Sequence, residues 1–137
     1  MKPTVIALFT ILATPALADS LPPCGLYKYK AEIVDVYDGD TVTADIDLGF
    51  HTWRRGEKLR LYGINAPEVR GGADEEKAKG IAARDALRGR ILDKEVIICT
   101  ISDRKEKYGR YLAEIYLGTE KLNDWLVTEG HAVYQDY

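Results

Sequence analysis

Three short segments carry side chains whose types and spacing could bind a phosphate. The first is YDGDTV, residues 37–42, where Asp40 stands just past an Asp-Gly pair. The second is LRLYGINAPE, residues 59–68, where Arg60 precedes a glutamate by eight positions. The third, KYGRYLAEIY at residues 107–116, contains Arg110. The guanidinium group of arginine can donate two parallel hydrogen bonds to a phosphate. Carboxylates can bind hard cations or transfer protons.

Each segment also has an ordinary interpretation. Asp-Gly pairs are mostly solvated hairpin turns, and Tyr-Gly before Arg110 can be a turn and no more. Arg60 could be an edge arginine whose stem covers apolar surface. The position of Asp40 indicates a functional role in addition. A carboxylate at the start of a strand is held in place by the hydrogen bonds of the sheet, so it can ligate a hard cation.

The strand that contains Arg60 ends in an unusual group of donors. Residues 65–68, NAPE, supply an amide, free carbonyls and a carboxylate. Pro67 biases Ala66 away from helix, so the carbonyl of Ala66 can point outward. Oxygen donors and a general-base candidate would then gather beside Arg60. Arg110 holds the same relative place on its own strand, so the two arginines could grip one phosphate from two sides.

The elements that must position these residues follow from hydrophobic periodicity. Alternating and apolar runs predict strands at 27–37, 41–48, 53–64, 95–101 and 111–117. Helices are predicted at 74–92 and from Leu122 to a stop at Gly130, with Gly80 and Gly89 fraying the ends of the first. Three strands, a helix, two strands and a helix form the OB-fold order. The sequence therefore predicts an α+β fold, a five-stranded OB-fold-like β-barrel with flanking helices.

The N-terminus has the pattern of an export signal. Lys2 precedes an apolar run, and Ala16-Leu17-Ala18 is a small-x-small cleavage site, so we expect a signal peptide at 1–18 and a single domain at 19–137. A retained anchor is the alternative. Loss of Lys2 takes the formal net charge from -3 to -4. Such an acidic protein is not steered towards a polyanion by its overall field, so a nucleic-acid substrate would need local basic groups or a bound cation.

The chain has two cysteines, Cys24 and Cys99. In an exported protein an even count favours one disulfide, and two unrelated thiols are the alternative. Neither a CxxC pair nor nearby histidines accompany them, so zinc is not expected. We expect a secreted or periplasmic protein.

The chain resembles the staphylococcal-type thermonuclease family of micrococcal-nuclease-like domains. The resemblance rests on three motifs in this order: DGDT, R-x(4)-NAPE and KYGR. The resemblance covers residues 33–133. It implies an OB-type barrel and a Ca²⁺-dependent nuclease that hydrolyses phosphodiester bonds of DNA, RNA or both.

The resemblance also implies roles for the matching positions. The calcium ligands would be Asp40, Asn65 and, through its main-chain carbonyl, Ala66. The phosphate-binding arginines and the general base would be Arg60, Arg110 and Glu68. Contacts to the terminal phosphate and sugar would come from Lys107 and Tyr108. One match fails, because the family usually has aspartate where this chain has Asn65. The site loses one negative charge, so we expect weaker metal binding and lower activity.

Two other functions fit the same barrel. One is a domain that binds single-stranded nucleic acid without cutting it, through exposed aromatics and a basic groove. The nine tyrosines leave that open, whereas the acidic net charge and the complete Arg-Arg-Glu set argue against it. The other is an exported interaction domain with relic site residues. We expect a monomer without a membrane partner after signal cleavage; the role of the turn at 49–56 is open.

Overall fold

Five long strands build the barrel. The computed structural model describes residue 1 and residues 24–137, so the predicted signal peptide lies outside the described residues apart from Met1. Antiparallel pairing gives the order β3-β2-β1-β5-β6, and a parallel pairing of β3 with β6 closes the barrel. The predicted OB-fold-like architecture is confirmed. The long strands are β1 (Lys28–Asp38), β2 (Thr41–Asp47), β3 (Trp53–Leu61), β5 (Glu95–Lys105) and β6 (Tyr111–Leu117).

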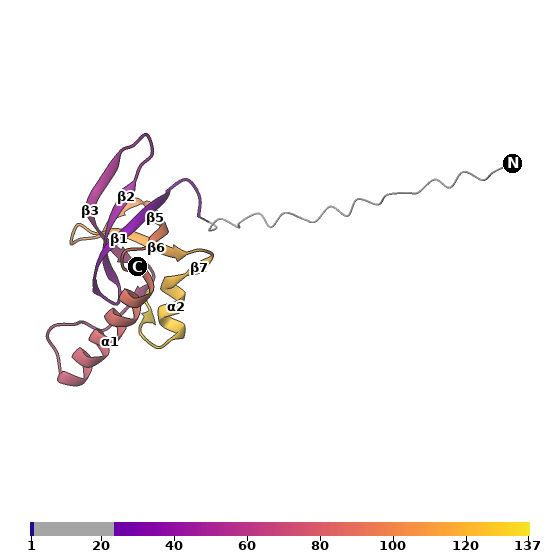
Figure 1. Cartoon of the computed structure of the whole chain (residues 1–137). Coiled ribbons are helices and arrows are strands. Elements are labelled where there is room, and N and C mark those ends of the chain that lie inside the picture. Colours follow the sequence, from indigo (N-terminus) through magenta and orange to yellow (C-terminus); the bar gives the residue numbers. More distant parts are fainter. Residues whose placement is uncertain (2–23) are drawn as a thin grey trace.

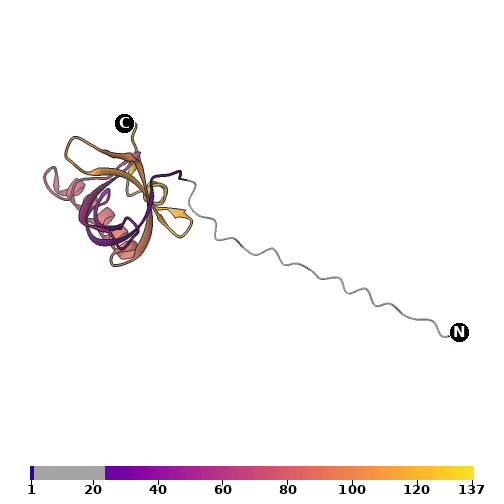
Figure 2. The same cartoon turned by 90° about the horizontal axis from the view of Figure 1, so that it is seen from above.

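Shorter elements surround this barrel. Strand β4 pairs with β8 in a separate two-stranded sheet, and β7 extends the barrel sheet beside β6. In Figure 1 both helices lie towards one end of the barrel and the β2–β3 hairpin projects at the other. The turned view in Figure 2 shows the strands curling around on themselves. The short elements are β4 (Ile64–Asn65), α1 (Asp74–Ile91), β7 (Glu120–Lys121), α2 (Leu122–Thr128) and β8 (Val133–Tyr134).

Three expected boundaries were wrong. The strand expected at 53–64 ends at Leu61, and its last residues form β4 after a turn at Gly63, whose φ is +77°. Strand β5 continues into the charged segment as far as Lys105, past an irregularity in its pairing with β6. The turn expected at 49–56 is shorter, because β3 already begins at Trp53.

Helix α1 covers the barrel with the apolar stripe that its sequence predicts. Ala83, Leu87 and Ile91 are fully buried at the spacing of successive turns. Gly80, expected to fray an end, instead lies buried in the middle of the helix. The physical reason is close packing: a bare Cα lets the helix approach the backbone of the segment that follows β4. No helix in the described part of the chain is long and apolar enough to cross a membrane.

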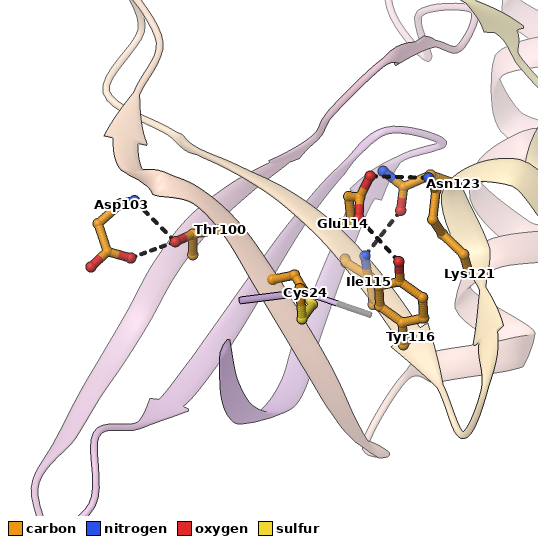
Figure 3. The surroundings of a disulfide bond; sticks show 9 residues. Cys24, Thr100, Asp103, Glu114, Ile115, Tyr116, Lys121 and Asn123 are labelled. Carbon is orange, nitrogen blue, oxygen red and sulfur yellow. Dashed lines mark hydrogen bonds and ion pairs between the residues drawn. A yellow bond between two sulfur atoms is a disulfide. The ribbon is translucent and has the colours of Figure 1, made fainter. Parts of the chain in front are cut away.

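A disulfide ties the start of the described chain to the barrel. Cys24, just before β1, is bonded to Cys99, which is buried within β5. Figure 3 shows the disulfide lying against β5, with Thr100 and Asp103 farther along the same strand. The predicted bridge is confirmed, and no free cysteine is present in the described residues.

Candidate active site

A buried ion pair forms the centre of the candidate site. Asp40 is the last residue of the β1–β2 turn. Arg60 lies beside it, because Arg60 on β3 is the register partner of Thr41, the first residue of β2. An Nη2 nitrogen of Arg60 is 3.1 Å from Oδ2 of Asp40, and both residues are at most 6% exposed. Arg60 is therefore an interior residue, not an edge arginine. A guanidinium this desolvated interacts more strongly with an incoming anion than a surface one.

The site holds more negative charge than Arg60 alone can balance. Asp38 is also buried, and its carboxylate accepts a hydrogen bond of 3.0 Å from the main-chain N–H of Asp40. Burial and then the nearby Asp38 raise the pKa of Asp40 to about 7, although the Arg60 guanidinium lowers it. Two buried carboxylates beside one buried guanidinium favour a further positive group at this point.

The segment after β4 closes onto the same ion pair. Arg60 donates through Nη2 to the amide oxygen of Asn65 at 3.2 Å, and through Nη1 to the carbonyl of Leu61 at 3.0 Å. The main-chain N–H of Ala66 donates to Oδ2 of Asp40 at 2.7 Å. The predicted group Asp40, Arg60, Asn65 and Ala66 is thus brought together by direct contacts.

Arg110 reaches this group from β6 through Thr41. Its Nη1 donates to the Thr41 hydroxyl at 2.9 Å, and that hydroxyl lies 3.3 Å from Oδ1 of Asp40. Each terminal nitrogen of Arg110 carries a second N–H. Those N–H groups have no hydrogen-bond partner within residues 24–137, so they can donate to a phosphate oxygen.

Glu106 holds Arg110 in this direction, a role that sequence reasoning missed. Its carboxylate accepts from Nε of Arg110 at 3.0 Å and from Nη2 at 3.3 Å. The same carboxylate accepts from the main-chain N–H groups of Tyr108 and Arg110 at 3.0 and 3.1 Å. The hydrogen bond from the Arg110 side chain is the main cause that lowers the pKa of Glu106 to about 2. The i,i+4 spacing of an acid and an arginine was the signal available in the sequence.

Glu68 lies near this group but has no direct bond to it. It is exposed, and among residues 24–137 no hydrogen bond or ion pair involves its carboxylate. It lines a cavity of about 470 Å³ together with Asn65 and Ala66, which do contact the central ion pair. An exposed carboxylate beside a cavity can accept a proton from water, as a general base must.

Two glycines allow this acid-bearing segment to pack closely. A Cβ on Gly80 of α1 would lie 2.2 Å from the carbonyl oxygen of Glu68. A Cβ on Gly39, in the β1–β2 turn, would lie 2.7 Å from the Cβ of Ala66 and 2.8 Å from the Cβ of Ala83 in α1. All three contacts are closer than real Cβ atoms show. Helix α1 and the Asp-Gly turn therefore fix the position of the segment 66–68.

Aromatic side chains flank the site on two sides. The ring of Tyr137 lies 5.9 Å from the Arg60 guanidinium and stacks on Tyr62 at 5.4 Å. On the other side Tyr108 is 71% exposed, with Lys107 at 4.9 Å and Arg110 at 5.5 Å from its ring centre. Lys107 and Tyr108 are thus exposed next to Arg110, where a ligand could reach them, whereas nothing in the sequence marked Tyr137.

The predicted cation ligands are oxygen atoms of the kinds that hard cations bind. They are the Asp40 carboxylate, the Asn65 amide oxygen and the Ala66 carbonyl, which are ligand types that calcium takes. Within residues 24–137 no three His, Cys, Asp or Glu side chains are grouped so that they could hold a metal ion.

Comparison with known proteins places the chain in a family. Residues 58–137, more than half of the chain, match the family described as "Staphylococcal nuclease homologue". The chain is 28% identical to a "Thermonuclease" of Staphylococcus hyicus over 93% of its length and 75% of the relative. It is 33% identical to a "Thermonuclease" of Staphylococcus intermedius over 71% of its length.

Other relatives are more distant or cover less of their own length. An "Uncharacterized endonuclease" of Haemophilus influenzae is 27% identical over 98% of this chain and 64% of that protein. The chain spans about half the length of the Staphylococcus intermedius relative, 54%. The match to the family model covers the second and third motifs, and the relatives are similar over most of the chain. The expected resemblance is confirmed, and this chain belongs to the staphylococcal nuclease homologue family.

Proposed function

We propose that this chain is a nuclease that hydrolyses phosphodiester bonds of DNA, RNA or both. The observation that carries the proposal is the continuous set of contacts from Arg60 through Asp40 and Thr41 to Arg110. These contacts connect the guanidinium groups of Arg60 and Arg110 through Asp40 and Thr41, so we infer that both groups serve one phosphate-binding site. Family membership and the names of the relatives support the same activity.

The two arginines would bind the phosphate and stabilise the charge that develops during its hydrolysis. Arg60 is held by Asp40, and Arg110 is held by Glu106, so neither must reorganise when the substrate binds. Pre-oriented donors of this kind typically contribute about 100-fold or more to the rate. A lysine would offer a point charge instead of a fork.

Glu68 would take the proton of the attacking water. Its carboxylate is exposed and lines the cavity beside Asn65, so water can reach it. Gly80 and Gly39 hold its segment against α1 and the Asp-Gly turn. The base is therefore fixed by the backbone, not by hydrogen bonds of its own carboxylate.

We infer that the cofactor is Ca²⁺, held by Asp40, Asn65 and the carbonyl of Ala66. The donor chemistry supports this inference, because carboxylate, amide and main-chain carbonyl oxygens are ligands that calcium takes. When bound, such a cation polarises a phosphoryl oxygen and lowers the pKa of a bound water. Because Asn65 contributes no charge, we expect a weaker metal site than three charged ligands would give.

We also propose export, with residues 1–18 as a cleaved signal peptide and 19–137 as one monomeric domain. The disulfide between Cys24 and Cys99 supports an oxidising compartment, since such bonds are rare in the cytosol. The periplasm and the medium both fit. N-terminal sequencing and the elution volume of the exported protein test the cleavage site and the oligomeric state.

The decisive experiment measures cleavage of single- and double-stranded DNA and RNA, with calcium and with excess chelator. Glu68→Gln and Arg110→Ala should each reduce the rate by about 100-fold or more while circular dichroism and the melting temperature stay close to wild type. Matched controls are Glu32→Gln and Arg84→Ala, an exposed acid on β1 and an arginine on α1 that pairs with its neighbour Asp85. Normal rates in both site variants would refute the assigned roles. Binding of single strands without cleavage would favour a non-catalytic domain.

A further inference from the structure

The segment 103–110, from the end of β5 to the start of β6, carries positive charge on an acidic protein. Its four cations and two acids are Arg104, Lys105, Lys107, Arg110, Asp103 and Glu106. Four positive and two negative charges give the segment a formal charge of +2, whereas the whole chain has -3. A polyanion that is not attracted by the overall field can bind such a local basic segment.

Most of this positive charge is not neutralised by the protein. Arg110 pairs with Glu106 at 3.0 Å. Asp103 accepts hydrogen bonds from the hydroxyl groups of Tyr29, at 2.8 Å, and of Thr100 (Figure 3). Within residues 24–137 no ion pair involves the other cations of the segment, which are all exposed: Arg104, Lys105 and Lys107. Their charge is therefore available to a ligand in solution.

Hydrogen bonds hold the segment in one conformation. The main-chain N–H of Glu106 donates to the carbonyl of Arg110 at 2.8 Å, and the N–H of Gly109 donates to the carbonyl of Glu106 at 2.9 Å. Lys105 and Tyr111 are register partners across β5 and β6. The pairing of these strands therefore fixes Lys105 and Tyr111 relative to Arg110.

Two cation–aromatic pairs lie along this segment. Nζ of Lys107 is 4.9 Å from the ring centre of Tyr108, the pair for which the resemblance implies contacts to a terminal phosphate and sugar. Nζ of Lys105 is 4.6 Å from the ring centre of Tyr111, and the roles assigned above do not use this second pair. Proteins that follow a nucleic-acid strand combine a basic surface with aromatic rings. The second pair extends that combination beyond the first.

We propose that Lys105 and Tyr111 form a second phosphate-binding site, for a phosphodiester farther along the polynucleotide than the scissile one. The inference rests on the proposed function, because it takes the scissile phosphate to lie at Arg110. The Arg110 side chain points to Thr41, whereas the Tyr111 ring packs against the hydrophobic core. The two phosphates therefore lie on different sides of the chain at 110–111. A substrate must extend past Arg110 to occupy both sites.

The chemistry of such a site gives it a recognisable signature. A phosphate is common to all nucleotides, so contacts to it carry no sequence information. Each phosphate that a lysine neutralises releases condensed counterions, so the contact contributes to the salt dependence of binding. The site should therefore favour polynucleotides over substrates with a single phosphate, in a salt-dependent way.

The test compares an oligonucleotide, which carries phosphates beyond the cleaved bond, with a dinucleoside monophosphate, which carries only the scissile one. Lys105→Gln removes the charge and keeps a polar side chain. Lys105→Arg keeps the charge and should restore wild-type behaviour. Lys94→Gln is the matched control, because Lys94 is an exposed lysine without an ion pair in residues 24–137 and lies just before the opposite end of β5.

We expect Lys105→Gln to raise KM for the oligonucleotide about fivefold more than KM for the dinucleoside monophosphate. The dependence of log KM for the oligonucleotide on log salt concentration should become shallower by about 1. Lys94→Gln should keep the wild-type slope. Equal changes in KM for both substrates would mean that Lys105 serves the scissile phosphate or a free phosphate ion, and would overturn the proposal.

A binding measurement separates this proposal from the proposed function. If the wild-type protein cleaves neither substrate, the proposed function fails by itself. Fluorescence anisotropy of a labelled oligonucleotide then gives the salt dependence of Kd for the same variants. A slope that is shallower in Lys105→Gln than in Lys94→Gln supports the second site, and equal slopes refute it.

Discussion

Gly80 offers the sharpest test of how the fold positions the general base. A Cβ at this position would meet the Glu68 carbonyl oxygen at 2.2 Å, the Glu68 carbonyl carbon at 2.6 Å and the Pro67 carbonyl oxygen at 2.8 Å. All three are backbone atoms, so no side-chain rotation relieves the clash. Ordinary contact begins at 3.4 Å. Gly80→Ala must therefore displace the Glu68 backbone, or the helix, by about 1 Å.

This displacement predicts a large kinetic effect and a small effect on stability. Misplacement of a catalytic group by about 1 Å can cost roughly 100-fold in rate, so kcat of Gly80→Ala should fall by about that factor. Overpacking costs about 1–3 kcal/mol, and replacement of glycine by alanine in a helix returns about 1 kcal/mol. The free energy of unfolding should therefore fall by no more than about 2 kcal/mol.

The matched control is Gly89→Ala in the same helix. A Cβ on Gly89 would meet nothing within 4 Å, and the residue is exposed. This variant should gain up to about 1 kcal/mol in stability and keep the wild-type kcat. The assays are steady-state cleavage of a single-stranded oligonucleotide and denaturant unfolding. If folded Gly80→Ala retains wild-type kcat, or if Gly89→Ala loses as much, the backbone contact does not position Glu68.

Three further predictions follow from single groups. Asn65→Asp restores a charge to the metal donors, so the calcium concentration for half-maximal cleavage should fall on the order of tenfold; an unchanged calcium titration would exclude Asn65 as a ligand. The hydrogen bond from Arg110 is the main cause that lowers the pKa of Glu106 from 4.5 to about 2. The ionised carboxylate therefore stabilises the fold at pH values above about 4.5. This contribution is lost as the pH falls from about 4.5 towards 2. Unfolding free energies measured between pH 5 and 2 should therefore decline less in Glu106→Gln than in wild type, and parallel declines would contradict this. The Cys24–Cys99 bridge spans 75 positions. Its reduction should lower the free energy of unfolding by about 4 kcal/mol. An unchanged denaturation midpoint would show that the bridge does not stabilise the folded protein.

The sequence by itself predicted the barrel, which the structure confirms, and it proposed candidate residues for the site. Strand alternation and an Asp-Gly turn are local signals, because side-chain direction and turn geometry depend on near neighbours. They predicted the strand order, and they placed Asp40 at a strand root and Arg60 within the next strand. The roles expected for Arg110 and Glu68 came from the family resemblance, which rests on short motifs at 59–68 and 107–116.

Only the tertiary structure decided how these residues meet. The contact between Arg110 and Thr41 joins positions 69 apart, and it exists because β3 and β6 pair in parallel when the barrel closes. The approach of α1 to the backbone of Glu68 depends on a glycine whose sequence context suggested only a weakened helix. The ring of Tyr137 reaches Arg60 in the same way, from a distant segment. Contacts of this kind depend on the packing of whole elements, so no local pattern in the sequence predicts them.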